Sequence, residues 1–277
     1  MLVCGHVSSN LKLHEYIDGV FKRLFSPPFN QLFPLPSLVS QCTVCRSWPA
    51  QPVCGPCVSR FSPQTRRCTA CAVDLPADLS LRPADTSDGT RLCMACIQHP
   101  PSVDSTRVAV AYSYPWSALI TRYKFGDRPG WAPFFADLLL RADGVRRALE
   151  TLHADDRIVP MPLSAERLQS RGFNQAWTLA NALAERAVSP ARPDARLLLR
   201  VKDTQPQTTL QREARRVNVR GAFQVDPLRA HVLLGKRVVL VDDVMTSGAS
   251  LFTAAAELRA AGAVHITAIA FARTPAT

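Results

Sequence analysis

The chain has 277 residues, of which 47% are apolar, and a formal net charge of +11 at pH 7. This length favours two domains, and the absence of a run of about 18 uncharged apolar residues argues against a membrane-spanning helix. The charge favours anionic partners such as nucleic acid or pyrophosphate, although genomic bias toward arginine would also produce it. Lys12, His14, Glu15 and Asp18 interrupt any secretory signal, so we expect a cytoplasmic protein.

Residues 1–40 are predicted to form an N-terminal extension with an amphipathic helix that ends at Pro27 and Pro28. Its apolar residues recur on one helical face: Leu13, Ile17, Val20, Phe21, Leu24 and Phe25. We expect this face to pack on the rest of the protein. Contact with a membrane or a partner is the alternative.

Residues 41–105 hold four Cys-x-x-Cys pairs: Cys42/Cys45, Cys54/Cys57, Cys68/Cys71 and Cys93/Cys96. Two such turns supply the four thiolates of a structural zinc site, so the spacing predicts a double zinc ribbon. Sequential pairing, an interleaved arrangement and a single occupied site all fit this pattern. Redox activity is the competing chemistry, but it would need one pair in a thioredoxin-like setting.

From residue 106 onward, predicted strands alternate with helices. The expected strands lie at 107–112, 157–163, 196–201, 238–241 and 265–271, and the expected helices at 116–125, 131–149, 174–186 and 251–261. This alternation predicts an α/β fold with a doubly wound parallel sheet over 106–277.

Three basic segments could contact an anion. Lys124 and Arg128 flank a predicted turn, although a cation at a helix end explains them equally well. Arg167 and Arg171 lie in a loop framed by prolines, before Asn174, which is also a suitable helix N-cap. The third segment, 204–223, resembles either a solvated face or a mobile basic lid, and its arginines are Arg212, Arg215, Arg216 and Arg220.

Residues 238–250 carry the most informative pattern in the chain. A buried strand, Val238 to Val241, leads into Asp242 and Asp243, and a turn rich in hydroxyl groups precedes the next helix. Such a turn and helix N-terminus bind a phosphate, and paired carboxylates suit the hydroxyls of a sugar or Mg²⁺. The predicted phosphate-binding residues are Thr246, Ser247, Gly248, Ala249 and Ser250. An acidic strand end that caps a helix is the alternative.

These segments together resemble the ComF family of competence-associated proteins. The matching residues are the cysteine pairs, Tyr-Lys-Phe at 123–125, Arg-Gly-Phe-Asn-Gln-Ala at 171–176, the basic pattern at 204–223 and the Asp-Asp loop at 242–250. The resemblance implies a type I phosphoribosyltransferase fold behind a double zinc ribbon, and a role in DNA uptake and natural transformation. It further implies that Asp242 and Asp243 grip the ribose of Mg-PRPP while residues 246–250 hold its 5-phosphate.

Arg167, Arg171, Arg212 and Arg216 are then candidates for binding pyrophosphate. The alternative is a non-catalytic module that binds single-stranded DNA and senses PRPP or carries a vestigial PRPP site. The aromatic residues available for base stacking, each also suited to a core, are Trp48, Trp116, Tyr123 and Trp131. The acceptor substrate and DNA-uptake partners stay open.

Overall fold

The structure, a computed structural model, describes residues 40–48, 50–76, 90–125, 129–202 and 221–275. The chain forms two compact units, Met1–Pro52 and Val53–Thr277. The predicted N-terminal helix, Arg212 and Arg216 lie outside the described residues. The predicted boundaries at 40/41 and 105/106 stay predictions.

In the described part of the first unit, Ser40 and Ala50 form an antiparallel bridge. Between them, the backbone N–H of Arg46 donates to the carbonyl of Cys42 at 2.9 Å. The N–H of Cys45 lies 3.5 Å from the Cys42 sulfur. The first Cys-x-x-Cys pair therefore occupies a tight turn with its sulfur bonded to the backbone.

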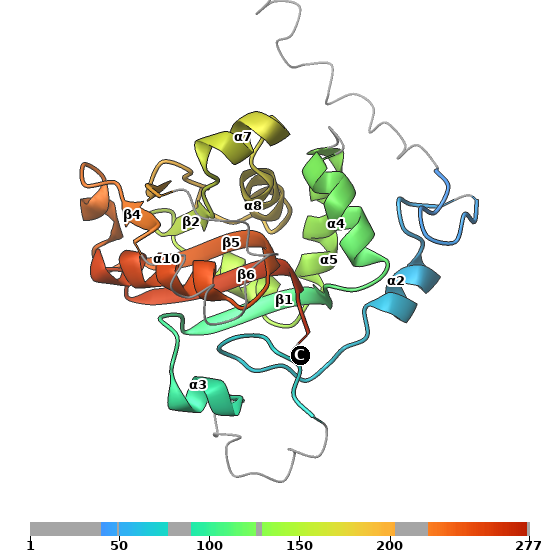
Figure 1. Ribbon diagram of the computed structural model, residues 1–277, viewed down its shortest axis with the longest axis horizontal. Coiled ribbons are helices and arrows are strands. Elements are labelled where there is room, and N and C mark those ends of the chain that lie inside the picture. Colours follow the sequence, from blue (N-terminus) through green and yellow to red (C-terminus); the bar gives the residue numbers. More distant parts are fainter. Residues whose placement is uncertain (1–39, 49, 77–89, 126–128, 203–220, 276–277) are drawn as a thin grey trace, which may run out of the picture. The chain divides into compact units, whose positions relative to one another are not determined.

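The second unit is built on a parallel sheet with the strand order β1-β6-β5-β2 (Figure 1). These strands are β1 (Ser105–Ala111), β6 (His265–Arg273), β5 (Arg237–Met245) and β2 (Arg157–Pro160). The predicted parallel α/β sheet is confirmed. Strand β5 extends past the predicted end at Val241, because the chain from Asp242 to Met245 continues to pair with β6.

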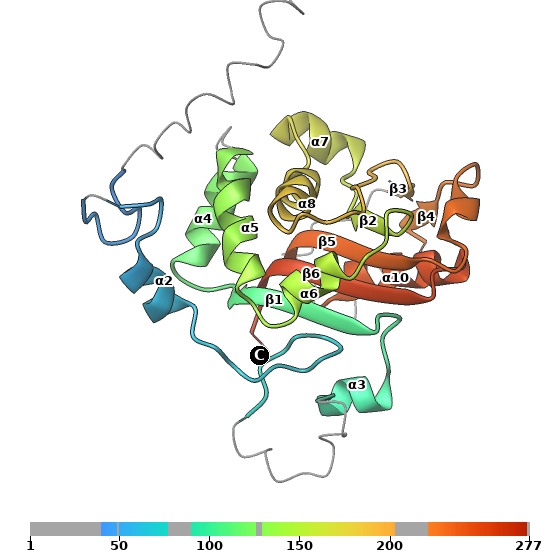
Figure 2. The same ribbon diagram turned by 180° about the vertical axis from the view of Figure 1, so that it is seen from behind.

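The two faces of this sheet are covered by different elements. Helices α4 (Trp116–Phe125), α5 (Ala132–Leu140) and α8 (Gln175–Arg186) lie together on one side of the strands (Figures 1 and 2). There the ring of Phe135 stacks on Phe271 with centroids 4.1 Å apart. Alternate residues such as Leu240 and Ala268 join a second core with Leu258 of α10 (Ala249–Ala260). Burial of both faces explains why β5 and β6 read as apolar runs.

Three predictions of local structure were wrong. The single helix expected at 131–149 is the 3₁₀ turn η2 (Pro129–Trp131), α5 and α6 (Val145–Glu150), because Gly144 adopts a left-handed φ of 73°. The loop expected before Asn174 contains α7 (Ala165–Arg171). The strand expected at 196–201 shrinks to β3 (Leu198–Arg200), which pairs with β4 (Phe223–Val225) outside the main sheet.

Other cysteines of the second unit lie beside short helices. Cys54 precedes α2 (Gly55–Phe61) and Cys93 precedes α3 (Met94–Gln98). Residues 68–71, which we call the 68–71 turn, dock on β1, one of the two outer strands of the described sheet. The Thr106 N–H donates to the Thr69 carbonyl at 2.7 Å, and the Thr106 hydroxyl donates to the Ala70 carbonyl at 2.6 Å. The turn is therefore part of the same folded unit as the sheet.

Candidate functional site

The two predicted carboxylates lie in the last part of β5. Asp243 is only 8% exposed, and its backbone N–H donates to Asp242 Oδ1 at 2.8 Å. Lys124, in the last turn of α4, places its Nζ 3.1 Å from Asp243 Oδ2. The parallel sheet and α4 thus bring two acids and one ammonium together from positions more than a hundred residues apart.

The local electrostatics change the ionisation of Asp242. Burial, aided by the negative charge of Asp243, raises the pKa of Asp242 to about 7, while Lys124 acts in the opposite direction. The ligand-free pair consequently carries less than two full negative charges near neutral pH. A divalent cation would favour the charged form of both acids.

The turn after β5 holds residues 246–250, the predicted phosphate loop, and leads into α10. Gly248 has a φ of 85° at the N-cap of α10, and an added Cβ would lie 2.5 Å from Met245 Cε. The Ala249 N–H donates to the Ser247 hydroxyl at 3.3 Å. The N-terminus of α10 therefore lies at the end of β5. The positive end of a helix dipole at such a position favours an anion.

A cavity of about 470 Å³ joins these parts. It is lined by both acids and by three of the predicted loop residues, Thr246, Gly248 and Ser250, whereas Ser247 and Ala249 do not line it. Arg167 and Arg171, the predicted pyrophosphate-side residues, line the same cavity from α7. The described part of the chain therefore brings acids, loop and arginines to one hollow.

The cavity wall at α7 is held by Arg171. Its Nη1 donates to Gln175 Oε1 at 2.9 Å, and its guanidinium lies 5.1 Å from the ring centroid of Phe125. Burial lowers the pKa of Arg171, and the charge of Asp243 opposes this shift. The predicted N-cap at Asn174 is confirmed, because its Oδ1 accepts from the N–H groups of Ala176 and Trp177 at 2.9 and 3.2 Å.

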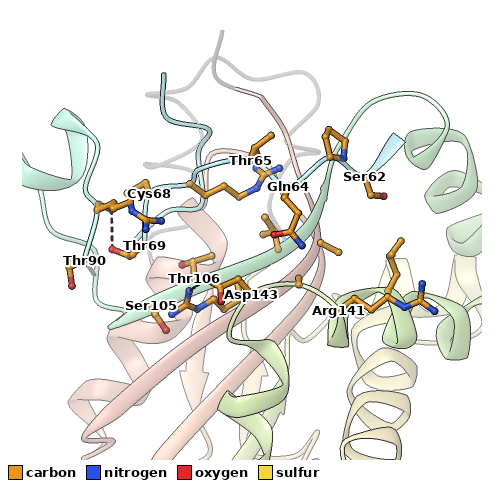
Figure 3. A pocket seen from close by; sticks show the side chains of 18 of the residues that line it. Ser62, Gln64, Thr65, Cys68, Thr69, Thr90, Ser105, Thr106, Arg141 and Asp143 are labelled. Carbon is orange, nitrogen blue, oxygen red and sulfur yellow. Dashed lines mark hydrogen bonds and ion pairs between the residues drawn. The ribbon is translucent and has the colours of Figure 1, made fainter. Parts of the chain in front are cut away.

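A larger cavity of about 630 Å³ lies along β1 and is lined by Thr69, Thr106 and Asp143, among others (Figure 3). Neither acid of the pair nor any residue of the phosphate loop lines it. Many of its polar groups are already bonded within the protein, as when Asp104 accepts from the N–H of Ile266 at 2.6 Å. We therefore place the candidate site in the smaller cavity.

The sulfur atoms of Cys68, Cys71, Cys93 and Cys96 all lie within 4.8 Å of one another. Those of Cys71 and Cys93 are 3.6 Å apart, close to the spacing of about 3.8 Å between two thiolates on one tetrahedral zinc. The Cys93 N–H also points at the Cys68 sulfur at 3.4 Å. Hydrogen bonding to Cys68 raises the pKa of Cys71 to about 12, so zinc would displace shared thiol protons. These four residues fit a zinc ion.

The first four cysteines are divided between the units. Cys42 and Cys45 belong to the first, and Cys54 and Cys57 to the second. A single site built from both pairs stays a prediction.

Sequence reasoning missed the contacts of two cations near the site, Lys124, whose side chain is 21% exposed, and the buried Arg273. Lys124 was interpreted as a helix-end cation, and Arg273 at the end of β6 was not considered. The local sequence does not indicate which groups these cations contact, because those groups belong to distant segments of the chain. Among the aromatic candidates for base stacking, Trp116 and Tyr123 are fully buried. No helix in the described ranges combines the length and apolar character needed to cross a bilayer.

Comparison with known proteins defines the class. Residues 163–277 match the family model described as a phosphoribosyl transferase domain. The chain is 31% identical over 211 residues to DNA utilization protein YhgH of Salmonella typhimurium, covering 75% of this chain and 90% of that protein. It is 32% identical over 181 residues to Competence protein F of Haemophilus influenzae, covering 65% and 78% of the two chains. Competence protein ComFC of Bacillus subtilis is 34% identical over 98 residues, which are 35% of this chain and 36% of that protein.

The chain thus carries a phosphoribosyl transferase domain. It belongs to the ComF family, as the sequence motifs indicated.

Proposed function

We propose that the protein binds Mg-PRPP as a phosphoribosyltransferase in the cytoplasm and acts in DNA uptake. The observation that carries this proposal is the shared cavity of Asp242, Asp243, the loop after β5 and the arginines of α7. The names of the relatives, competence and DNA utilization proteins, support the biological role.

In this proposal the acids, the loop and the arginines bind different parts of PRPP. The carboxylates of Asp242 and Asp243 accept hydrogen bonds from the two ribose hydroxyls. The backbone N–H groups and hydroxyls of residues 246–250 hold the 5-phosphate at the N-terminus of α10. Arg167 and Arg171 bind the pyrophosphate and stabilise its charge as it leaves.

The carboxylates also suit Mg²⁺, which binds oxygen ligands and keeps several of its waters. When bound, Mg²⁺ supplies positive charge to the pyrophosphate oxygens. Asp242 and Asp243 would hold it, either directly or through water. Structural zinc would be held by the second cysteine cluster and, following the sequence prediction, by the first four cysteines.

Titration calorimetry of the zinc-loaded protein with Mg-PRPP tests the site. We expect binding to the native protein and its loss in the Asp242→Asn/Asp243→Asn variant. Asp137→Asn is the control, because Asp137 pairs with Arg186 and does not line the cavity. Equal affinity in the double variant and the native protein would rule out this site, whereas consumption of PRPP would separate an enzyme from a sensor.

A second candidate function is binding of single-stranded DNA, which the net charge of +11 and the names of the relatives favour. A labelled oligonucleotide should then bind without PRPP, with an affinity that falls steeply as salt rises. Absence of a mobility shift at about 50 mM salt, where phosphate contacts are stronger than at physiological salt, would remove this candidate.

A further inference from the structure

Arg273 lies between the cysteine cluster and the phosphate loop. It is the last residue of β6 and is only 6% exposed. Its Nε donates to the carbonyl of Cys71 at 3.0 Å, on the cysteine side. A buried guanidinium requires hydrogen-bond acceptors, since leaving its charge unpaired is costly.

On the opposite side, the same guanidinium contacts the start of the phosphate loop. Arg273 Nη1 donates to the carbonyl of Thr246 and lies 3.4 Å from that of Met245. It also donates to the carbonyl of Thr274 at 2.8 Å. One side chain therefore joins the ends of β5 and β6 to a turn that carries a cysteine of the cluster.

The 68–71 turn itself is fixed from several directions. Cys68 and Cys71 belong to the four-sulfur cluster, and the Thr69 N–H donates to the Arg91 carbonyl at 2.7 Å. Cys68, Cys71 and Met245 belong to the same buried core as Ala249, the first residue of α10. The turn and the start of α10 are therefore joined by a shared core as well as by Arg273.

We propose that Arg273 is a positioning residue that couples metal binding at Cys68, Cys71, Cys93 and Cys96 to the order of the phosphate loop. With the metal bound, the Cys71 carbonyl holds the guanidinium, and the guanidinium holds the carbonyl of Thr246. Without it, the turn relaxes, Arg273 loses one acceptor, and the loop becomes less ordered. The PRPP part of this inference rests on the proposed function, whereas the order of the loop does not.

Hydrogen–deuterium exchange of the loop tests the coupling without any ligand. Amides of residues 246–250 should exchange faster after chelation of the metal from the native protein. Arg273→Lys should show the same fast exchange with metal present, because one ammonium cannot span the carbonyls that the guanidinium joins. Thr106→Val is the matched control, because it removes a different side-chain hydrogen bond to the 68–71 turn, one that is not part of the link from Arg273 to the loop.

Ligand affinity provides the second readout. If native protein binds Mg-PRPP, Arg273→Lys should weaken binding about tenfold at unchanged metal content. Bound PRPP should also raise the affinity of the cysteine cluster for its metal, measured at equilibrium against a chelator, by the factor by which the metal raises the affinity for PRPP. Thr106→Val should change neither quantity. Failure of the native protein to bind PRPP would reject the proposed function and leave the exchange test of the coupling intact.

If the amide exchange rates of residues 246–250 change neither on metal removal nor in Arg273→Lys, the inference is overturned. If Arg273→Lys does not fold, the chelation experiment on native protein decides alone. Unchanged loop exchange after complete metal removal, verified by metal analysis, then rejects the coupling.

Discussion

Asp242 is a partly buried acid whose proton is held more tightly in the folded chain than in the unfolded one. Its pKa rises from an ordinary value of 3.8 to about 7 through burial and the charge of Asp243. Its contribution to stability is therefore fully present below about pH 4 and is lost as the pH rises through about 7. At pH 8 the ionised carboxylate therefore opposes folding.

Asp242→Asn should accordingly raise the Tm at pH 8 and have little effect at pH 4. An increase of several degrees is expected, since about 1 kcal/mol shifts the Tm of a chain of this size by about 2–4 °C. Thermal unfolding across this pH range measures the difference. If the Tm of the native protein and that of Asp242→Asn change with pH in parallel, the raised pKa of Asp242 is contradicted.

Gly248 has a backbone conformation and a close environment that exclude a side chain. Its φ is 85°, and an added Cβ would come within 2.6 Å of Phe252 Cε2 as well as close to Met245. Gly248→Ala should destabilise the protein by about 1–3 kcal/mol through backbone strain and displace the phosphate loop. Calorimetry with Mg-PRPP and thermal unfolding should both register the change.

Gly130→Ala is the control for this substitution. Gly130 does not have a positive φ, and an added Cβ meets nothing within 4 Å. A loss of ligand binding in Gly130→Ala equal to that in Gly248→Ala would remove the geometric argument.

At the scale of elements, Asn174 ties the start of α8 to β2. Its Oδ1 caps two N–H groups of α8, and its Nδ2 donates to the Met161 carbonyl at 3.0 Å, just beyond β2. Asn174→Ala should therefore cost about 1–2 kcal/mol, and it should also loosen Gln175, which holds Arg171.

Ser164→Ala at the start of α7 is the comparison, because within the described residues the Ser164 hydroxyl accepts one N–H, from Arg167 at 3.4 Å. Denaturant unfolding should rank Asn174→Ala as clearly the more destabilised. The reverse order would show that α7 rather than α8 depends on its cap.

The long elements were predictable because their patterns are strong. The apolar runs of β5 and β6 and the helix at 116–125 follow from periodicity and from signals at their ends. Helix α7 was missed because it is seven residues long and buries none of them, so it has no apolar period. The two strands of the β3–β4 pair have only three residues each, too few to show alternation.

At the scale of the whole molecule, the predictable part of the site was the continuous segment 242–250. A strand, an acid pair and a turn next to one another in sequence specify their own geometry. The contacts of Lys124 with Asp243 and of Arg273 with Cys71 join segments 119 and 202 residues apart. Since such pairs are created by the fold, one sequence without the fold does not reveal them.

The docking of the 68–71 turn on β1 has a consequence for solubility. An outer strand offers backbone groups to any other chain, and proteins avoid aggregation by covering such edges. Here the Thr69 carbonyl accepts a hydrogen bond from the N–H of Thr106 in β1. Chelation of the metal should release this cover and produce particles of growing size in dynamic light scattering, before the α/β fold melts. If the protein aggregates as expected, a shortage of metal would lower the amount of soluble protein through edge-to-edge assembly of β1. A metal-free protein that stays monodisperse would instead show that this edge is protected by other means.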